Sequence, residues 1–214
     1  MKIKNIFSLL ILGSLLGCNG ERANTNSTIQ YMDSKSEFNK KLVNHFPPRK
    51  ITIPYELINS KNIDKNDVSF MLYEYRAGDK TKADLSNSMK KKAVAHYTNN
   101  DTDLLIVNRY ETIDTYENRL DVVISDSSKI EKKSYEKLLP IPNFIDFQEP
   151  NTKKDIKLKG NFDIYVLEAK SGNHFKEFDL KPNPQMPKKW KNGYSKGVAI
   201  EKERSIIIYW AIVW

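Results

Sequence analysis

The chain has 214 residues, of which 39% are apolar and 29% charged, with 35 Lys and Arg against 27 Asp and Glu. This is the composition of a globular protein, because the apolar fraction is too high for a disordered chain and glycine and proline are too few for a fibre. Its single cysteine excludes an intrachain disulfide and a thiolate cluster for zinc or iron–sulfur, and its length suits one domain.

Residues 1–17 have the pattern of an export signal. Lys2 and Lys4 precede an apolar run from Ile6 to Leu16, which is shorter than the roughly 20 residues that a membrane-spanning helix needs. A small residue, Gly17, then precedes Cys18. We therefore predict that residues 1–17 are a signal peptide. An ordinary secretory signal followed by an unrelated cysteine is the alternative.

The stretch Leu15-Leu16-Gly17-Cys18 resembles the lipobox of bacterial lipoproteins. In that family the cysteine thiol carries diacylglycerol, the peptide is cut just before it, and the new amine is often acylated too. The resemblance implies lipidation of Cys18 and attachment to a membrane of the cell envelope. Asn19 stands where many inner-membrane lipoproteins have Asp, which implies the outer membrane of a Gram-negative cell. Two or three acyl chains anchor a protein stably, whereas one binds only marginally.

The segment from Asn19 to Met32 is polar and has little apolar periodicity. It predicts a flexible, lipid-anchored tether over residues 18–32 and a single domain over residues 33–214. A flexible chain of this length spans roughly 20 Å.

Two helices are predicted in the N-terminal half. Ser34 or Ser36 can cap the first, in which apolar residues recur every fourth position from Phe38 to Phe46 before two prolines end it. The second is predicted over Ala83–Tyr97, with Thr81 and Asp84 in capping-box spacing; its apolar stripe comprises Leu85, Met89, Ala93 and Tyr97. Lys90, Lys91 and Lys92 lie mostly off this stripe and predict a solvated face.

Strands outnumber helices in the rest of the chain. Runs of β-branched and aromatic residues bounded by turn signals predict strands at Val68–Tyr75, Leu104–Tyr110, Leu120–Ser125, Phe162–Ala169, Gly197–Glu201 and Ser205–Val213, with weaker ones at Ile51–Ile58 and Ile156–Lys159. Strands with two early helices favour an α+β fold with a mainly antiparallel sheet in one domain.

The last residues, Ser205 to Trp214, are almost continuously apolar. They are too few to span a bilayer as a helix, and they lack the alternation of a barrel strand. They predict a central strand buried on both faces, paired with Gly197–Glu201 through a turn at Lys202–Arg204. Together with Met186-Pro187 and Trp190–Gly197, this ending resembles the C-terminal block of small uncharacterised envelope lipoproteins, which implies a location but no mechanism.

The sequence contains no complete catalytic or metal-binding motif. Gly193–Gly197 matches G-x-S-x-G, but a strand follows it and no His comes after Ser195, so we predict a turn at Asn192-Gly193 and a structural serine. The three histidines, His45, His96 and His174, lack the spacing of a zinc motif. Glycine-rich phosphate loops are absent. We predict no catalytic residue, metal or cofactor.

The most promising contact surface is Leu180–Lys196. It alternates cations with aromatic residues, and the candidates are Lys188, Lys189, Trp190, Lys191, Tyr194 and Lys196. After removal of residues 1–17, the positive excess lies in the last third of the chain, because Pro150–Trp214 has thirteen Lys and Arg against seven Asp and Glu. An exported protein rarely meets nucleic acid, so a protein, an acidic glycan or an acidic lipid headgroup is the expected partner besides the membrane. A packed structural loop is the alternative.

Two functions therefore compete. The anchor and the lack of a catalytic constellation favour an envelope protein that binds a partner protein, a glycan or a toxin. The alternative is an envelope hydrolase whose site is assembled from distant segments. A deep pocket that combines a histidine with a carboxylate would favour the enzyme, and a flat aromatic and basic surface would favour the binding protein.

Overall fold

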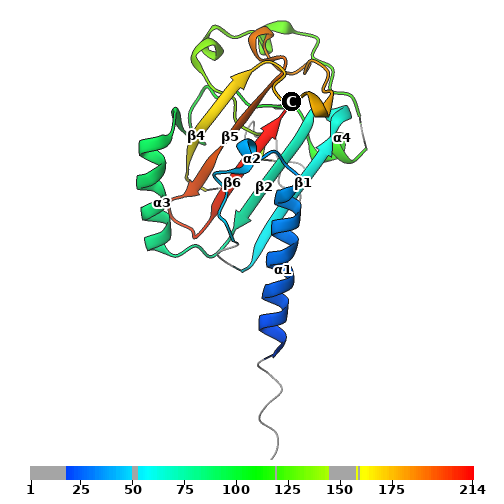
Figure 1. The fold of residues 1–214 in the computed structure, drawn as a ribbon. Coiled ribbons are helices and arrows are strands. Elements are labelled where there is room, and N and C mark those ends of the chain that lie inside the picture. Colours follow the sequence, from blue (N-terminus) through cyan, green and yellow to red (C-terminus); the bar gives the residue numbers. More distant parts are fainter. Residues whose placement is uncertain (1–17, 50–52, 119, 145–157, 159) are drawn as a thin grey trace, which may run out of the picture.

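The computed structural model describes residues 18–49, 53–118, 120–144, 158 and 160–214. These residues form the predicted α+β fold, built on one antiparallel sheet of six strands in the order β1-β2-β6-β5-β4-β3 (Figure 1). The strands are β1 (Tyr55–Asn62), β2 (Asp67–Glu74), β3 (Ala95–Thr98), β4 (Phe162–Ser171), β5 (Gly193–Glu201) and β6 (Ile207–Val213).

Helices are few and mostly short. The α-helices are α1 (Cys18–Ser36), α2 (Lys40–Val43), α3 (Asp79–Lys92) and α4 (Ile113–Glu117); the 3-10 turns are η1 (Ile63–Lys65), η2 (Ser127–Lys129), η3 (Lys133–Lys137), η4 (Lys176–Phe178) and η5 (Lys188–Trp190). Within the described part of the chain, no helix is both long enough and apolar enough to cross a bilayer.

Strand β6 is the central strand that the sequence predicts. It pairs with β2 on one side and with β5 on the other, and all of its residues are buried. Tyr209 and Ala211 pack into the core on one face of the sheet, whereas Ile208 and Trp210 pack into the core on the other. A strand that is covered on both faces needs no polar side, and this explains its continuous apolar sequence.

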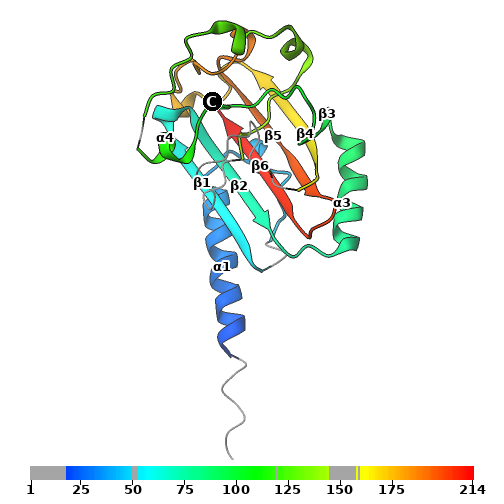
Figure 2. The ribbon, with the colours of Figure 1, turned by 180° about the vertical axis from the view of Figure 1, so that it is seen from behind.

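The two faces of the sheet are covered by different kinds of structure. Helices α1, α2 and α3 supply Tyr31, Leu42 and Met89 to the core on the first face, which is turned to the viewer in Figure 1. The opposite face, shown in Figure 2, is covered mainly by the irregular chain between β3 and β4 and by the segment before β5. We call these the helical face and the loop face.

Two predicted strands are wrong. Leu104–Tyr110 forms only a single bridge, Ile106 with Ile141, and its apolar residues are buried because they lie across the loop face. Leu120–Ser125 pairs with no described strand, and Val123 is 83% exposed. β-Propensity reports a fit to a half-buried surface and does not ensure that a partner strand exists. Except for Leu158, the predicted strand Ile156–Lys159 lies outside the described residues.

The second helix starts earlier and ends earlier than predicted. Its N-cap is Gly78, so Thr81 and Asp84 are already inside α3 and form no capping box. The chain leaves the helix at Ala93, and the next residues pair with β4 as β3. Pairing at the edge of the sheet therefore overrides the helical spacing that includes Tyr97. Lys90, Lys91 and Lys92 are exposed, as the sequence predicts.

The N-terminal segment differs most from expectation. The predicted tether belongs to α1, and the predicted first helix is interrupted at Asn39, whose side chain caps α2. Tyr31 is fully buried, and its hydroxyl donates to the Pro47 carbonyl at 2.6 Å. The packed part of the protein therefore begins before Asp33, because an aromatic side chain in this polar segment is part of the core.

Candidate functional site

The predicted contact surface is not one surface. Trp190 is 3% exposed and lies in the core of the loop face, with its ring centroid 6.1 Å from that of Trp214. Tyr194 packs into the core of the helical face, and Lys196 follows two positions later in β5 on that same face. Lys188 and Lys189 remain exposed near Trp190, on the other side of the sheet. Alternation along β5 thus divides the predicted surface.

Ser195 has a structural role, but the predicted turn around it is wrong. The motif Gly193–Gly197 lies within β5, and Ser195 is fully buried with its hydroxyl donating to the Pro140 carbonyl at 2.6 Å. Neither glycine has a positive φ. Neighbouring atoms leave no room for a side chain at either position. An added Cβ at Gly193 would lie 2.8 Å from the Lys170 carbonyl oxygen and 2.9 Å from the Trp214 ring. At Gly197 it would lie 2.1 Å from the Tyr165 carbonyl oxygen and 2.4 Å from the Trp210 ring.

The three histidines do not meet. His45 lies on the helical face, where its Nε2 is 2.9 Å from the Trp210 carbonyl oxygen; burial lowers its pKa to about 3, so the neutral ring donates this hydrogen bond. His96 lies 3.0 Å from Asp163 at the exposed edge of the sheet. Within the described ranges, no three His, Cys, Asp or Glu side chains are grouped so that they could hold a metal ion.

A pocket of about 320 Å³ opens on the helical face, and it contains two of the predicted contact residues. The lining comes from the segment around α2, from β4 and the turn that follows it, and from β5: Asn39, Lys41, Asn44, Glu168, Lys170, His174, Phe175, Tyr194 and Lys196. We call it the lysine pocket.

A β-bulge builds the wall of the lysine pocket. Val166 of β4 is paired with Gly197, but Glu168 is paired with the very next residue, Lys196, so Leu167 is the extra residue. The bulge reverses the alternation of β4 and turns Glu168 toward the helical face. Residues directly opposite each other on antiparallel strands share a face, so Glu168 meets Lys196, and Lys170 meets Tyr194.

Glu168 is the acceptor at the centre of the pocket. Its Oε1 receives hydrogen bonds from Lys170 Nζ at 2.8 Å and from Tyr194 Oη at 2.6 Å, and its Oε2 lies 3.1 Å from Lys196 Nζ. The bonds from Lys170 and Tyr194 lower the pKa of Glu168 to about 2, although partial burial acts in the opposite direction. Glu168 is therefore ionised at neutral pH.

The three lysines of the pocket differ in exposure. Lys196 is 6% exposed, and its ammonium group also contacts the Lys41 carbonyl at 2.5 Å and Asn44 Oδ1 at 3.2 Å, so its three N–H groups all have acceptors. The side chains of Lys41 and Lys170 are exposed at the mouth. Three lysines around one carboxylate leave an excess of positive charge, which favours an anionic ligand.

A histidine and a carboxylate in one pocket is the combination expected of a hydrolase. The question is therefore whether His174 or Glu168 is free to act as a general base. Glu168 already accepts from three donors and has a pKa of about 2, which makes it a poor base at neutral pH. The Nε2 atom of His174 is engaged with the Ser171 carbonyl at 2.9 Å. Among the described residues that line the pocket, none is a Ser, Thr or Cys. Glu168 and His174 are thus both held by contacts within the protein.

Sequence reasoning identified Tyr194 and Lys196 but missed their partners. The spacing of Glu168 and Lys170 at the end of a predicted strand is a usable signal for a shared face, but the bulge that directs them to the helical face leaves no mark in the sequence. Comparison of the chain with models of known protein families, with curated proteins and with solved structures gives no match.

Proposed function

We propose that the protein is a lipid-anchored protein of the cell envelope that binds an acidic glycan in the lysine pocket. The observation that carries the binding function is the buried, fully paired Lys196 beneath two exposed lysines, Lys41 and Lys170. An ammonium group held in place by three acceptors keeps the floor of the pocket rigid. The Lys41 amine and the N–H groups of Lys170 that do not bind Glu168 can then donate to the carboxylates of a ligand.

The neighbouring carboxamides suit the hydroxyl groups of a sugar. Asn39 Oδ1 accepts from the Lys41 backbone N–H at 3.0 Å, and Asn44 Oδ1 contacts Lys196 Nζ at 3.2 Å. With both oxygens engaged inside the protein, the amide nitrogens are the groups offered to a ligand. A ligand with carboxylates and hydroxyls, such as a uronic acid polymer, combines the two chemistries that the pocket provides.

The proposed anchor would leave this pocket accessible. Helix α1 projects beyond the sheet and away from α2 (Figure 1). Tyr55 holds α1 at the Ser27 carbonyl, and from there back to Cys18 the helix extends about 14 Å at 1.5 Å per residue. Lipid on Cys18 would therefore lie at the far end of a helical stalk, and the outer membrane is the location that the lipobox and Asn19 favour.

Binding can be tested by calorimetry of the full chain in detergent with oligogalacturonate. We expect saturable binding that weakens as salt rises, because exposed charges are screened. Lys170→Glu should reduce affinity at least tenfold, whereas Lys189→Glu, which changes an exposed lysine outside the pocket, should leave it unchanged. Equal binding of a neutral maltooligosaccharide, or unchanged binding by Lys170→Glu, would contradict the proposal.

The anchor can be tested independently. Mass spectrometry of the membrane fraction should find an acylated peptide that begins at Cys18. Cys18→Ser should leave an uncleaved or mislocalised precursor, because the thiol that takes the lipid is gone. Normal membrane localisation of this variant would show that the cysteine is not the anchor.

A further inference from the structure

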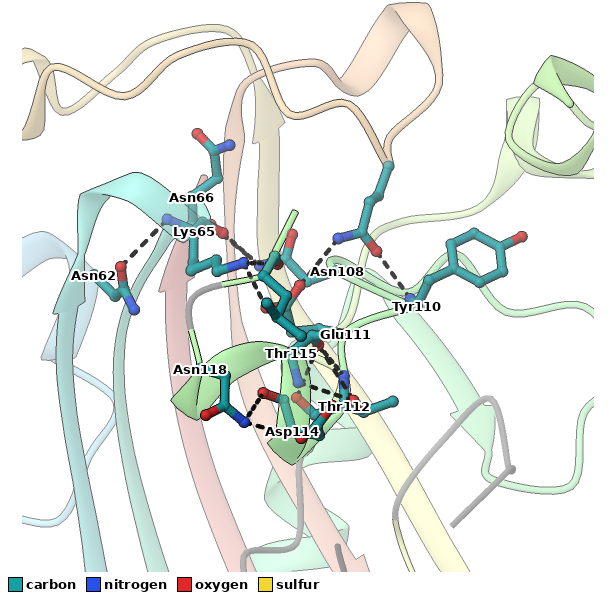
Figure 3. Close-up of polar contacts among 12 residues, drawn as sticks. Asn62, Lys65, Asn66, Asn108, Tyr110, Glu111, Thr112, Asp114, Thr115 and Asn118 are labelled. Carbon is teal, nitrogen blue, oxygen red and sulfur yellow. Dashed lines mark hydrogen bonds and ion pairs between the residues drawn. The ribbon is translucent and has the colours of Figure 1, made fainter. Parts of the chain in front are cut away.

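A second polar cluster lies at the β1–β2 turn, on the loop-face side of the sheet (Figure 3). It joins the turn at Lys65 and Asn66 to the irregular segment at Asn108 and Glu111, and also to Asn143, Asn183 and Gln185. The last two belong to the proline-rich segment before β5. The cluster shares no residue with the lysine pocket.

Carbonyl partners fix the orientation of the amide groups. Asn108 Nδ2 donates to the Lys65 carbonyl at 3.0 Å, and Asn108 Oδ1 accepts from Asn183 Nδ2 at 2.7 Å. Asn143 Nδ2 donates to the carbonyls of Asn108 at 2.7 Å and Glu111 at 3.1 Å. Because a carbonyl can only accept, neither Asn108 nor Asn143 can be turned around without losing these bonds.

With the Asn108 and Asn143 amides fixed, some buried oxygen atoms of the cluster lack a hydrogen-bond donor among the described residues. Asn66 Oδ1, Glu111 Oε1 and Asn143 Oδ1 are buried and have no hydrogen-bond partner among the described residues. They belong to residues that are 8%, 2% and 4% exposed. Glu111 Oε1 has Lys65 Nζ at 3.5 Å, an ion-pair distance that is long for a hydrogen bond. A buried acceptor without a donor is unfavourable, so the cluster is suited to a ligand that donates hydrogen bonds.

Two of these acceptors line a pocket with a negative excess. Asn66 and Glu111 are in the wall of a pocket of about 130 Å³, which has room for several water molecules. Among the described residues, its charged lining consists of Asp64, Glu111 and Asp121 against one cation, Lys65. Burial raises the pKa of Glu111 and Lys65 opposes this effect, so the carboxylate lies where a further positive charge would stabilise it.

We propose that this pocket binds the primary ammonium group of a small amine or of a lysine side chain. An ammonium group has N–H donors and a positive charge, which match the oxygens of Asn66 and Glu111 and the net negative lining of the described residues. A metal ion is the less suitable occupant, because no three carboxylate or histidine side chains in the described ranges are grouped to ligate one. This site differs from the lysine pocket in residues, face and charge, and either can fail without the other.

The test is an NMR titration of the full chain in detergent with methylammonium chloride, at constant ionic strength. We expect saturable shifts in the amide signals of Asn66 and Glu111. Tetramethylammonium, which has the same charge but no N–H, should bind at least tenfold more weakly. Nα-acetyl-lysine methylamide distinguishes the two sources, since tighter binding than methylammonium would indicate a lysine side chain of a protein.

Two variants locate the site. Glu111→Gln should weaken methylammonium binding at least tenfold. Asp121→Asn should have the same effect. Because Asp121 is exposed, its substitution should not disturb folding, so it tests the proposal even if Glu111→Gln is unstable. Glu203→Gln makes the same change of charge in the β5–β6 turn and should have no effect. Absence of saturable binding, equal binding of tetramethylammonium, unchanged binding by Asp121→Asn, or tighter binding of calcium chloride than of methylammonium would each overturn the proposal.

Discussion

Glu168 and Glu111 are the same side chain in two surroundings, and their pKa values move in opposite directions. Donors from Lys170 and Tyr194 lower the pKa of Glu168 to about 2, whereas burial raises that of Glu111. Hydrogen-bond donors lower the pKa of a carboxylate, and loss of water on burial raises it. The donors dominate at Glu168, and burial dominates at Glu111. Glu168 is therefore a fully hydrogen-bonded part of the pocket wall. Glu111 is the acceptor that we propose for a ligand.

His45 should make stability depend on pH. Its pKa is about 3 in the folded protein and about 6.5 when exposed, so between these values the unfolded chain binds a proton that the folded chain does not. The free energy of unfolding should therefore fall as pH drops below about 6.5, by at most about 1.4 kcal/mol per pH unit. Urea denaturation at pH 7 and pH 5 should show a smaller loss for His45→Gln than for the wild type. The exposed His174→Gln should retain the wild-type loss; equal losses for all three proteins would exclude His45 as the cause.

Trp190 should affect stability and not binding. Its indole is buried against Trp214, and the Trp214 Nε1 donates to the Trp190 carbonyl at 2.7 Å. Trp190→Ala should reduce the free energy of unfolding by about 3 to 5 kcal/mol in urea denaturation, because it leaves a cavity in the core. The neighbouring Lys189→Ala should change it by less than about 0.5 kcal/mol. A small loss for Trp190→Ala would place this residue on the surface, as the contact-surface hypothesis requires.

At the scale of elements, β5 joins the two cores and one wall of the lysine pocket. In the neighbouring strand β4, a bulge directs Glu168 into the pocket. In β5, the lack of a side chain at Gly197 leaves space for the Trp210 ring. A strand with partners on both edges and both faces has little freedom to accommodate a change of shape.

Gly197→Ala should therefore be strongly destabilising. The added Cβ would lie 2.1 Å from the Tyr165 carbonyl oxygen and 2.4 Å from the Trp210 ring, and the backbone atom cannot move aside without breaking the sheet. We expect a loss of about 3 kcal/mol or more in thermal or urea unfolding. Gly78→Ala is the matched control, because no atom lies within 4 Å of its added Cβ. Its loss of N-cap preference should cost about 1 kcal/mol or less. Similar melting temperatures for the two variants would contradict the close packing of Gly197.

For the whole molecule, the position of the N-terminal boundary matters most. Tyr31 lies before the domain start predicted at Asp33, yet its ring packs 6.2 Å from that of Phe70 in the core of the helical face. The stalk that would carry the lipid is thus continuous with the folded core.

A chain shortened to begin at Asp33 should be less stable than one that begins at Asn26. Removing the buried Tyr31 should cost about 3 to 5 kcal/mol, which lowers the melting temperature by roughly 6 to 20 °C for a protein of this size. The chain that begins at Asn26 keeps the Ser27 carbonyl and Tyr31, and it should melt near the temperature of the full chain. Equal melting temperatures for the two shortened chains would restore the boundary at Asp33.

Local patterns in the sequence determined the α+β class, the central position of β6, and most of β2 and β4. They could do so because a continuous or β-branched apolar run indicates whether a strand is buried on one face or on both. The solvated lysines at Lys90–Lys92 follow from helical spacing in the same way. Tertiary structure decided what depends on distant partners. Register and alternation in β5 separate Trp190 from Tyr194, the bulge after Val166 directs Glu168 to Lys196, and lack of a partner strand leaves Leu104–Val107 as a covering segment. Both pockets are assembled from segments far apart in the chain, so no local pattern could show which charges would meet.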